Sequence, residues 1–166
     1  IAHPLLDQCK VLSESERLYS TSFSIDKHWL LSEHKTNQGA CLIPGTGYIE
    51  LLRASFSHHI GFEKPSRESA IELSDVQFLS AFQVAKNQNR NLTIRVDGAA
   101  EDGDMTIFSE SEEMPMVTGS ARRVSRTAAV AVDLSGIRSR CQQSLTTVDG
   151  FLDQNFMNFG PRWGCI

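Results

Sequence analysis

A histidine, a glycine and a proline-glycine turn give residues 34–48 the groups needed to remove a proton next to a carbonyl. The imidazole of His34 is a suitable base, because this type of side chain is neutral over much of the physiological pH range. Gly39 lets a substrate approach the backbone closely. Pro44 and Gly45 are predicted to start a helix, whose unpaired N–H groups and partial positive charge suit an enolate-like oxygen. A base beside such a helix end is what abstraction of the α-proton of a thioester requires.

A simpler interpretation of this segment stays open: a turn before a core helix, with His34 merely solvated. The other histidines carry less information, since a single histidine is more often a structural or surface residue than a catalyst. His59 falls on the apolar face of the predicted helix and is expected to be a hydrogen-bonded core residue, with His58 beside it in the helix. His3 and His28 have no supporting context beyond nearby apolar residues.

Composition limits the classes of protein to which the chain can belong. Its 166 residues, with a mass of 18.4 kDa, are 40% hydrophobic and 22% charged, a globular balance that fits one domain and the start of another. A net charge of −4 and a pI near 5.7 argue against a nucleic-acid surface, which needs clustered basic side chains. With no apolar run of about 18 residues and no signal peptide pattern at the start, we expect no membrane partner either.

The cysteines favour a reducing compartment. Cys9, Cys41, Cys141 and Cys165 are widely scattered, and no CxxC pair indicates zinc or redox chemistry. Two disulfides stay an alternative, but a chain of this length buries a core without them. The sequence therefore predicts free thiols, a cytoplasmic location and no metal site.

Hydrophobic periodicity predicts one long helix followed by several strands. Alternating residues from 19 to 26 indicate a half-buried strand after a polar entry segment, and residues 27–44 are predicted to form a loop. Apolar residues then recur at helical spacing from Tyr48 to His59, with Gly61 as a C-terminal stop.

After residue 69 the pattern is that of strands, with a bulge near Ser74-Asp75 where the phase of the alternation changes. Three further strands are predicted, around residues 92–96, 105–107 and 116–124. A run of strands around one buried helix indicates an α+β fold with an antiparallel sheet.

The remainder of the chain divides into two parts. Residues 125–150 are rich in small and polar side chains and are predicted to form a linker or crossing segment, with a short helix near Leu134 to Gln143. Residues 151–166 are rich in aromatic side chains, so their packing partner is expected further along the polypeptide. The chain is therefore expected to be truncated.

The motifs that carry this chemistry resemble a known family. His34 through Pro44 resembles the His-x-x-x-Gly-x-x-x-x-Pro motif of dehydratase domains in modular polyketide synthases. Pro44-Gly-Thr-Gly-Tyr48-Ile-Glu-Leu looks like the start of their central helix, and His3-Pro4-Leu5-Leu6 is similar to their usual opening. Near the other end, Asn158-Phe159-Gly160-Pro161-Arg162-Trp163 is similar to the Tyr-Gly-Pro-x-Phe motif that opens the second half of these domains. The motifs follow the expected order over nearly the whole chain.

Three departures from the family pattern stand out. Five positions rather than four separate His34 from Gly39, so the loop carries one extra residue before this glycine, while the interval from Gly39 to Pro44 is kept. Phe159 replaces the usual tyrosine, which removes a hydroxyl group that could form a hydrogen bond within the site. Trp163 replaces the usual phenylalanine, a sterically mild change.

The resemblance implies an α+β hot-dog fold, in which an antiparallel sheet wraps around a long central helix. Residues 1–124 would form the first hot-dog domain of a double hot-dog, 125–150 the crossing segment, and 151–166 the start of the second domain. The site of such a domain lies between the halves, with the histidine from the first and an aspartate from the second. That aspartate follows the Gly-Pro motif, so Asp149 and Asp153, which precede the motif, do not correspond to it. The chain alone is expected to be inactive.

The resemblance also implies a reaction. The substrate would be a β-hydroxyacyl chain held as a thioester on the phosphopantetheine arm of an acyl carrier protein, with no other cofactor. His34 would remove the α-proton, and the aspartate would protonate the departing hydroxyl group. Backbone amides near Gly39 to Cys41, or at the helix start, would stabilise the enolate-like oxygen. The implied substrate-binding residues are Gly39, Cys41, Pro44, Gly45, Tyr48, Phe159, Gly160 and Pro161. The implied partners are the carrier protein, neighbouring synthase domains, the second half of the same polypeptide and a second copy in a homodimer.

Three alternatives stay open from the sequence. Related domains use the same histidine to shift a double bond or to close a cyclic ether. A domain that lacks the aspartate would be a non-catalytic structural module. A free-standing single hot-dog thioesterase or hydratase is disfavoured, because Phe159-Gly160-Pro161 is a second opening motif for which such an enzyme has no use.

Overall fold

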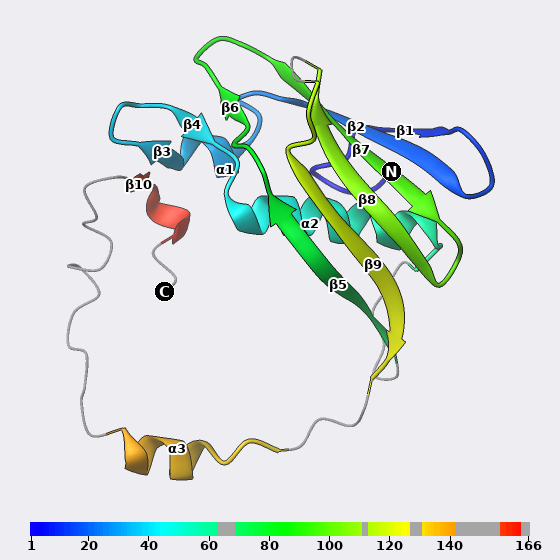
Figure 1. Ribbon diagram of the computed structural model, residues 1–166. Coiled ribbons are helices and arrows are strands. Elements are labelled where there is room, and N and C mark those ends of the chain that lie inside the picture. Colours follow the sequence, from blue (N-terminus) through cyan, green and yellow to red (C-terminus); the bar gives the residue numbers. More distant parts are fainter. Residues whose placement is uncertain (63–68, 111–112, 127–130, 142–156, 164–166) are drawn as a thin grey trace.

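The computed structural model describes residues 1–62, 69–110, 113–126, 131–141 and 157–163. A six-stranded antiparallel sheet curves around one long helix, α2 (Gly45–His59), and a four-stranded sheet lies beside the N-terminal end of that helix (Figure 1). The predicted combination of a long helix with an antiparallel sheet is therefore present.

The larger sheet contains strands from both ends of the first 125 residues. Its order is β1 (Gln8–Val11), β2 (Glu16–Phe23), β7 (Arg90–Gly98), β8 (Asp102–Ser109), β9 (Val117–Ser125) and β5 (Ser69–Phe78). All neighbouring strands in it are antiparallel. The polar entry segment contains a strand that the sequence pattern did not indicate, because β1 pairs with β2 there. Strand β1 is mostly exposed and has no buried alternating residues to reveal it.

The core lies between the concave face of this sheet and α2. Alternate residues of the strands face the helix, and Phe23 and Ile94 are completely buried. On α2, Leu51 and Phe56 are completely buried against them. Full burial of side chains of this size stabilises the fold by about 1.5–3 kcal/mol each. Packing on this scale fixes α2, and with it the turn at its N-terminus.

Both ends of α2 match the sequence prediction. Pro44 is the N-cap residue, with extended backbone angles. At the other end Gly61 has φ +67°, the left-handed conformation that commonly ends a helix and that glycine adopts at low cost.

The predicted bulge interrupts β5. The register against β9 shifts between Ser74 and Gln77, and Asp75 between them has φ +52°. The shift reverses the alternation, so that Leu73 and Val76 both pack against the core.

The smaller sheet corrects the prediction of a loop over residues 27–44. Its order is β10 (Met157–Phe159), β3 (His34–Thr36), β4 (Cys41–Leu42) and β6 (Gln83–Val84), and the short helix α1 (Trp29–Ser32) precedes β3. Strands of two or three residues are too short to show a period of two, so the sequence pattern gave no sign of them.

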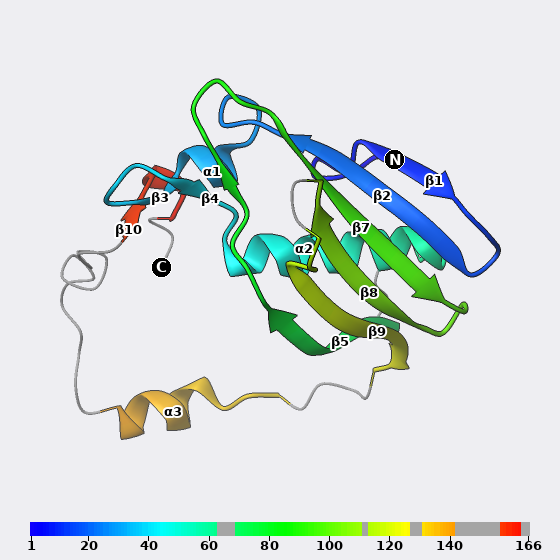
Figure 2. The ribbon, with the colours of Figure 1, turned by 45° about the horizontal axis from the view of Figure 1, so that its top comes forward.

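The predicted helix in the crossing segment is present as α3 (Leu134–Arg140), which lies apart from both sheets in the two views (Figures 1 and 2). Residues 142–156 lie outside the described part of the chain, so the predicted domain boundaries stay predictions. Within the described residues, no helix is long and apolar enough to cross a membrane. Cys9, Cys41 and Cys141 are free thiols.

Candidate active site

His34 lies where the first part of the chain meets its last described segment. It is the first residue of β3, it is half-buried, and it pairs directly with Phe159 of β10. Both views place β10 and the 3-10 helix η1 (Pro161–Trp163) beside β3 (Figure 2). Two motifs that are far apart in the sequence are therefore adjacent in the fold.

A hydrogen bond determines which nitrogen of the His34 ring is available. Its Nδ1 lies 3.0 Å from the carbonyl oxygen of Leu42. A carbonyl only accepts, so Nδ1 carries the hydrogen and donates it. In the neutral ring Nε2 then has a free lone pair, which is the state that a general base needs. Because Leu42 precedes Pro44 by two residues, the bond also ties the ring to the turn that starts α2.

Aromatic rings surround the imidazole. The ring centroids of Phe159 and Trp163 each lie 5.6 Å from that of His34, and 5.7 Å from one another. Trp29 of α1 extends the cluster, with its ring 6.2 Å from Trp163. The indole Nε1 of Trp163 is buried and has no hydrogen-bond partner among the residues described. Phe159 and Trp163 therefore pack near the imidazole, while Phe159 and Trp29 keep 37% and 46% of their surface exposed.

Gly39 lies in the turn between β3 and β4, and the reason for a glycine there differs from the one that the sequence suggested. Gly39 has φ +85°, and a Cβ atom there would meet no other atom within 4 Å. The backbone conformation, rather than a close approach, therefore requires glycine. The amide of Gly39 donates to the Thr36 carbonyl at 2.8 Å, and that of Ala40 to Thr36 Oγ1 at 3.1 Å. These two amides are engaged, so the expectation that they stabilise an enolate is not supported by this geometry.

The start of α2 offers the other predicted donors. Gly47 and Tyr48 donate their amides to the Pro44 carbonyl, at 2.8 and 3.4 Å. Those of Gly45 and Thr46 have no partner among the described residues. Two free N–H groups at the positive end of a helix are suited to an oxygen that gains negative charge.

Two of the predicted substrate-binding residues are core residues. Cys41 is buried, and its Sγ lies 3.8 Å from the Gly39 carbonyl oxygen. The Tyr48 hydroxyl accepts a hydrogen bond of 2.8 Å from the amide of Phe82, and its ring packs against Phe78. These contacts shape the wall behind the helix start, and direct contact of either residue with substrate stays a prediction.

Glu33, which the sequence did not single out, joins the His34 motif to the Gly160-Pro161 motif. Its backbone carbonyl accepts from the Gly160 amide at 2.9 Å. Its carboxylate accepts from the Arg162 amide at 2.8 Å and forms an ion pair with the Arg162 guanidinium group. Since 129 residues separate Glu33 from Arg162, no local pattern could reveal the contact.

The remaining histidines have structural surroundings. His59 is buried, accepts from Arg17 at Nδ1 (2.8 Å) and donates from Nε2 to the Gly98 carbonyl (3.1 Å), which confirms it as a hydrogen-bonded core residue. His3 pairs with a carboxylate of α2. His28 is only 4% exposed, and burial lowers the pKa of its imidazole.

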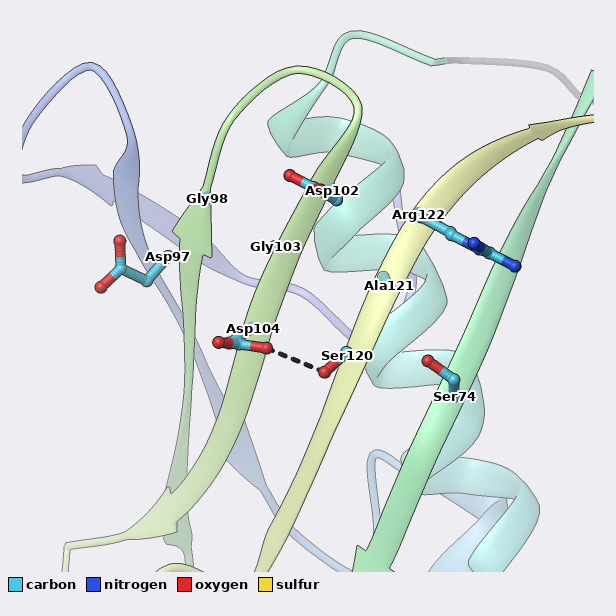
Figure 3. A pocket seen from close by; sticks show the side chains of 9 residues that line it. All are labelled: Ser74, Asp97, Gly98, Asp102, Gly103, Asp104, Ser120, Ala121 and Arg122. Atoms are coloured by element: carbon cyan, nitrogen blue, oxygen red, sulfur yellow. Dashed lines mark hydrogen bonds between the residues drawn. The ribbon is translucent and has the colours of Figure 1, made fainter.

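A hollow lies away from His34, on the larger sheet (Figure 3). It has a volume of about 390 Å³ and is lined by residues of β5, β7, β8 and β9. Asp104 accepts a 2.8 Å hydrogen bond from Ser120 across it. Within the described residues, no group of three or more His, Cys, Asp or Glu side chains is arranged to hold a metal ion.

Comparison with protein families decides where the chain belongs. The profile of the family described as "Polyketide synthase dehydratase domain" matches residues 3–110, which is more than half of the chain. The chain belongs to this family. The match contains the His34 motif, the start of α2 and most of the larger sheet, and it ends before Phe159.

Solved structures show the fold of this polyketide synthase dehydratase chain. The dehydratase domain of the CurF module of curacin polyketide synthase is similar over 96% of this chain and 59% of its own, with a TM-score of 0.79 and 20% identity. The CurK dehydratase domain (95% and 57%, TM-score 0.78, 20% identity) and that of RzxB from Pseudomonas fluorescens (96% and 57%, 0.77, 20%) are also similar. The hot-dog fold prediction is therefore confirmed. The chain spans less than two thirds of these domains.

Two further solved forms of the CurK dehydratase are inactive mutants. One has phenylalanine in place of a histidine, and the other has asparagine in place of an aspartate. Among curated proteins, no significant match to the chain is found.

Proposed function

We propose that this chain is the first half of a domain that dehydrates a β-hydroxyacyl thioester, carried on an acyl carrier protein, to an α,β-unsaturated thioester. The observation that carries the proposal is the hydrogen bond from His34 Nδ1 to the Leu42 carbonyl, 3.0 Å long. It leaves Nε2 as a base and ties it to the turn before the free amides of α2. The inactive histidine and aspartate mutants of the CurK dehydratase support a reaction that needs both residue types.

The reaction begins at the α-carbon of the substrate. Nε2 of His34 takes the α-proton, and the electron pair moves toward the thioester carbonyl. The amides of Gly45 and Thr46 face the developing charge on that oxygen. The positive charge on the imidazole ring is stabilised by the Leu42 carbonyl at Nδ1.

Loss of the hydroxyl group completes the reaction. The returning electron pair forms the double bond while the C–O bond at the β-carbon breaks. A carboxylic acid from the second half of the domain supplies a proton to the leaving oxygen, so that one water molecule departs. No metal or redox cofactor takes part in these steps, and phosphopantetheine enters only as the arm that holds the substrate.

The proposed function implies the same partners and location as the sequence analysis. The partners are the acyl carrier protein, neighbouring synthase domains, the second half of the same polypeptide and a second copy of the domain. The location is the cytoplasm.

The test uses the full dehydratase domain that contains this chain. It is incubated with β-hydroxyacyl and with 2-enoyl carrier-protein substrates, and the products are analysed by mass spectrometry and NMR. Loss of one water molecule from the first substrate is expected. A product that is only a double-bond isomer or a cyclic ether would overturn dehydration, and no conversion at all would favour a structural module.

A further inference from the structure

Glu33 connects the strand that carries His34 with the segment that surrounds the imidazole ring. It ends α1, where its own amide donates to the Trp29 carbonyl at 2.9 Å, and it directly precedes His34. Its carbonyl and both carboxylate oxygens then contact residues 160–162. One side chain therefore joins two parts of the sequence at the base itself.

The carboxylate of Glu33 is largely buried, and both of its oxygens have a partner. The Glu33 side chain is 11% exposed, and its two oxygens bind different groups of Arg162, the amide and the guanidinium. A largely buried carboxylate needs such partners, and removal of the Arg162 side chain would take away its charged partner. The guanidinium group of Arg162 also lies over the ring of Trp29, 5.5 Å from its centroid. Glu33 and Arg162 therefore form one connected unit with α1.

The two residues that bind Glu33 lie, in the sequence, between the two aromatic residues that contact His34. Gly160 and Arg162 bind Glu33, while Phe159 and Trp163, on either side of them in the sequence, contact His34. A Cβ atom on Gly160 would overlap the Glu33 side chain, so the two segments approach as closely as glycine permits. Loss of the Glu33 side-chain contacts would therefore loosen the segment that carries both aromatic neighbours of the imidazole, while the pairing of β10 with β3 would remain.

We propose that Glu33 is a positioning residue for His34: its contacts with Gly160 and Arg162 hold Phe159 and Trp163 against the imidazole, and so fix the orientation of the base. The catalytic part of this inference rests on the proposed dehydration. The packing part does not, because it concerns the contact between β3 and residues 157–163.

The first experiment measures turnover in the full dehydratase domain. Glu33→Gln keeps the size of the side chain but removes its charge. Misplacement of a catalytic base lowers kcat far more than it weakens substrate binding. We expect kcat to fall roughly 10- to 100-fold with KM within about threefold of the parent. Arg162→Gln should have a similar effect, and the double variant should be no worse than the poorer single variant, because both remove the same interaction.

Glu72→Gln is the matched control. It removes another glutamate–arginine pair, Glu72 with Arg122 at 2.6 Å, which is more exposed and lies on the larger sheet. It should leave kcat and KM unchanged. Unchanged kcat in Glu33→Gln, or a loss confined to KM, would overturn the proposal, and so would strictly additive effects of the two single variants.

A second measurement does not depend on turnover. Amide hydrogen exchange of Gly160 and Arg162, followed by NMR, should be faster in Glu33→Gln than in the parent and unchanged in Glu72→Gln. If the parent domain shows no dehydration, the proposed function fails, yet faster exchange still supports the contact. Equal exchange in the parent and Glu33→Gln overturns the positioning role whatever the activity.

Discussion

At the scale of single residues, the chemistry depends on which nitrogen of one imidazole ring is free. The Leu42 carbonyl occupies Nδ1 of His34 and leaves Nε2 as the base of the proposed dehydration. Replacement of His34 by alanine in the full domain should therefore lower kcat on the order of 10²–10⁴-fold, the contribution typical of a general base. The free energy of unfolding should change little, because the side chain is only half-buried. Product formation and urea unfolding measure the two effects.

The control for this substitution is another histidine. His58 is exposed and lies in α2 far from β3, so His58→Ala should retain the turnover of the parent. Undiminished turnover in His34→Ala would remove His34 from the mechanism.

The placement of His34 beside the turn that starts α2 was predictable from the sequence, whereas the contacts of Glu33 were not. The local order of histidine, glycine, proline and helix start already places a base near a helix N-terminus, because these residues are close in sequence. The role of Glu33 depends on Arg162, 129 residues away, and on an antiparallel pairing of three-residue strands. Contacts of this kind come from tertiary packing, which the sequence of either segment does not specify alone. The bonding of the Gly39 and Ala40 amides likewise comes from the turn itself, where the first donates to the backbone carbonyl of Thr36 and the second to its side-chain hydroxyl.

At the scale of elements, the length of each helix or strand determined whether the sequence pattern predicted it. The helix α2 and the long strands β2, β7, β8 and β9 repeat their apolar pattern often enough to be recognised. The strands of the smaller sheet, two or three residues each, do not. Yet the smaller sheet is the one that holds His34 against residues 157–163. The part of the fold that is hardest to predict is therefore the part that positions the site.

Two glycines in the first turn of α2 give a matched test of this packing. Glycine-to-alanine changes in a helix usually stabilise it by up to about 1 kcal/mol. At Gly45 a Cβ atom would lie 3.8 Å from the Phe78 ring, an ordinary contact, so Gly45→Ala should be neutral or stabilising. At Gly47 it would lie 2.9 Å from Cγ2 of Ile43, a stiff and buried side chain. Gly47→Ala should therefore destabilise by about 1–3 kcal/mol.

Urea unfolding of the two variants measures both effects. If Gly47→Ala proves as stable as Gly45→Ala, Ile43 yields easily, and the turn before α2 is less tightly packed than the contacts indicate.

At the scale of the whole molecule, stability depends on pH through the titratable groups whose pKa values the fold shifts. Burial is the main cause that lowers the pKa of His28, and it lowers the pKa of His58 in the same direction. Hydrogen bonds to Lys27 and Arg53 lower the pKa values of Asp7 and Glu50. Histidine side chains ordinarily titrate near neutral pH and carboxylates titrate only in acid, so their effects on the free energy of unfolding fall in separate pH ranges.

The prediction for His28 follows from the direction of its shift. As pH falls past the ordinary histidine value of about 6.5, the unfolded chain binds a proton that the folded chain does not yet accept. The free energy of unfolding should therefore decrease between about pH 7.5 and 5.5, before any carboxylate is protonated. His28→Gln cannot take up the proton and should show a shallower decrease, which urea unfolding at several pH values measures. An equal slope in the parent and His28→Gln would mean that His28 is protonated equally well in the folded and unfolded chains, in spite of its 4% exposure.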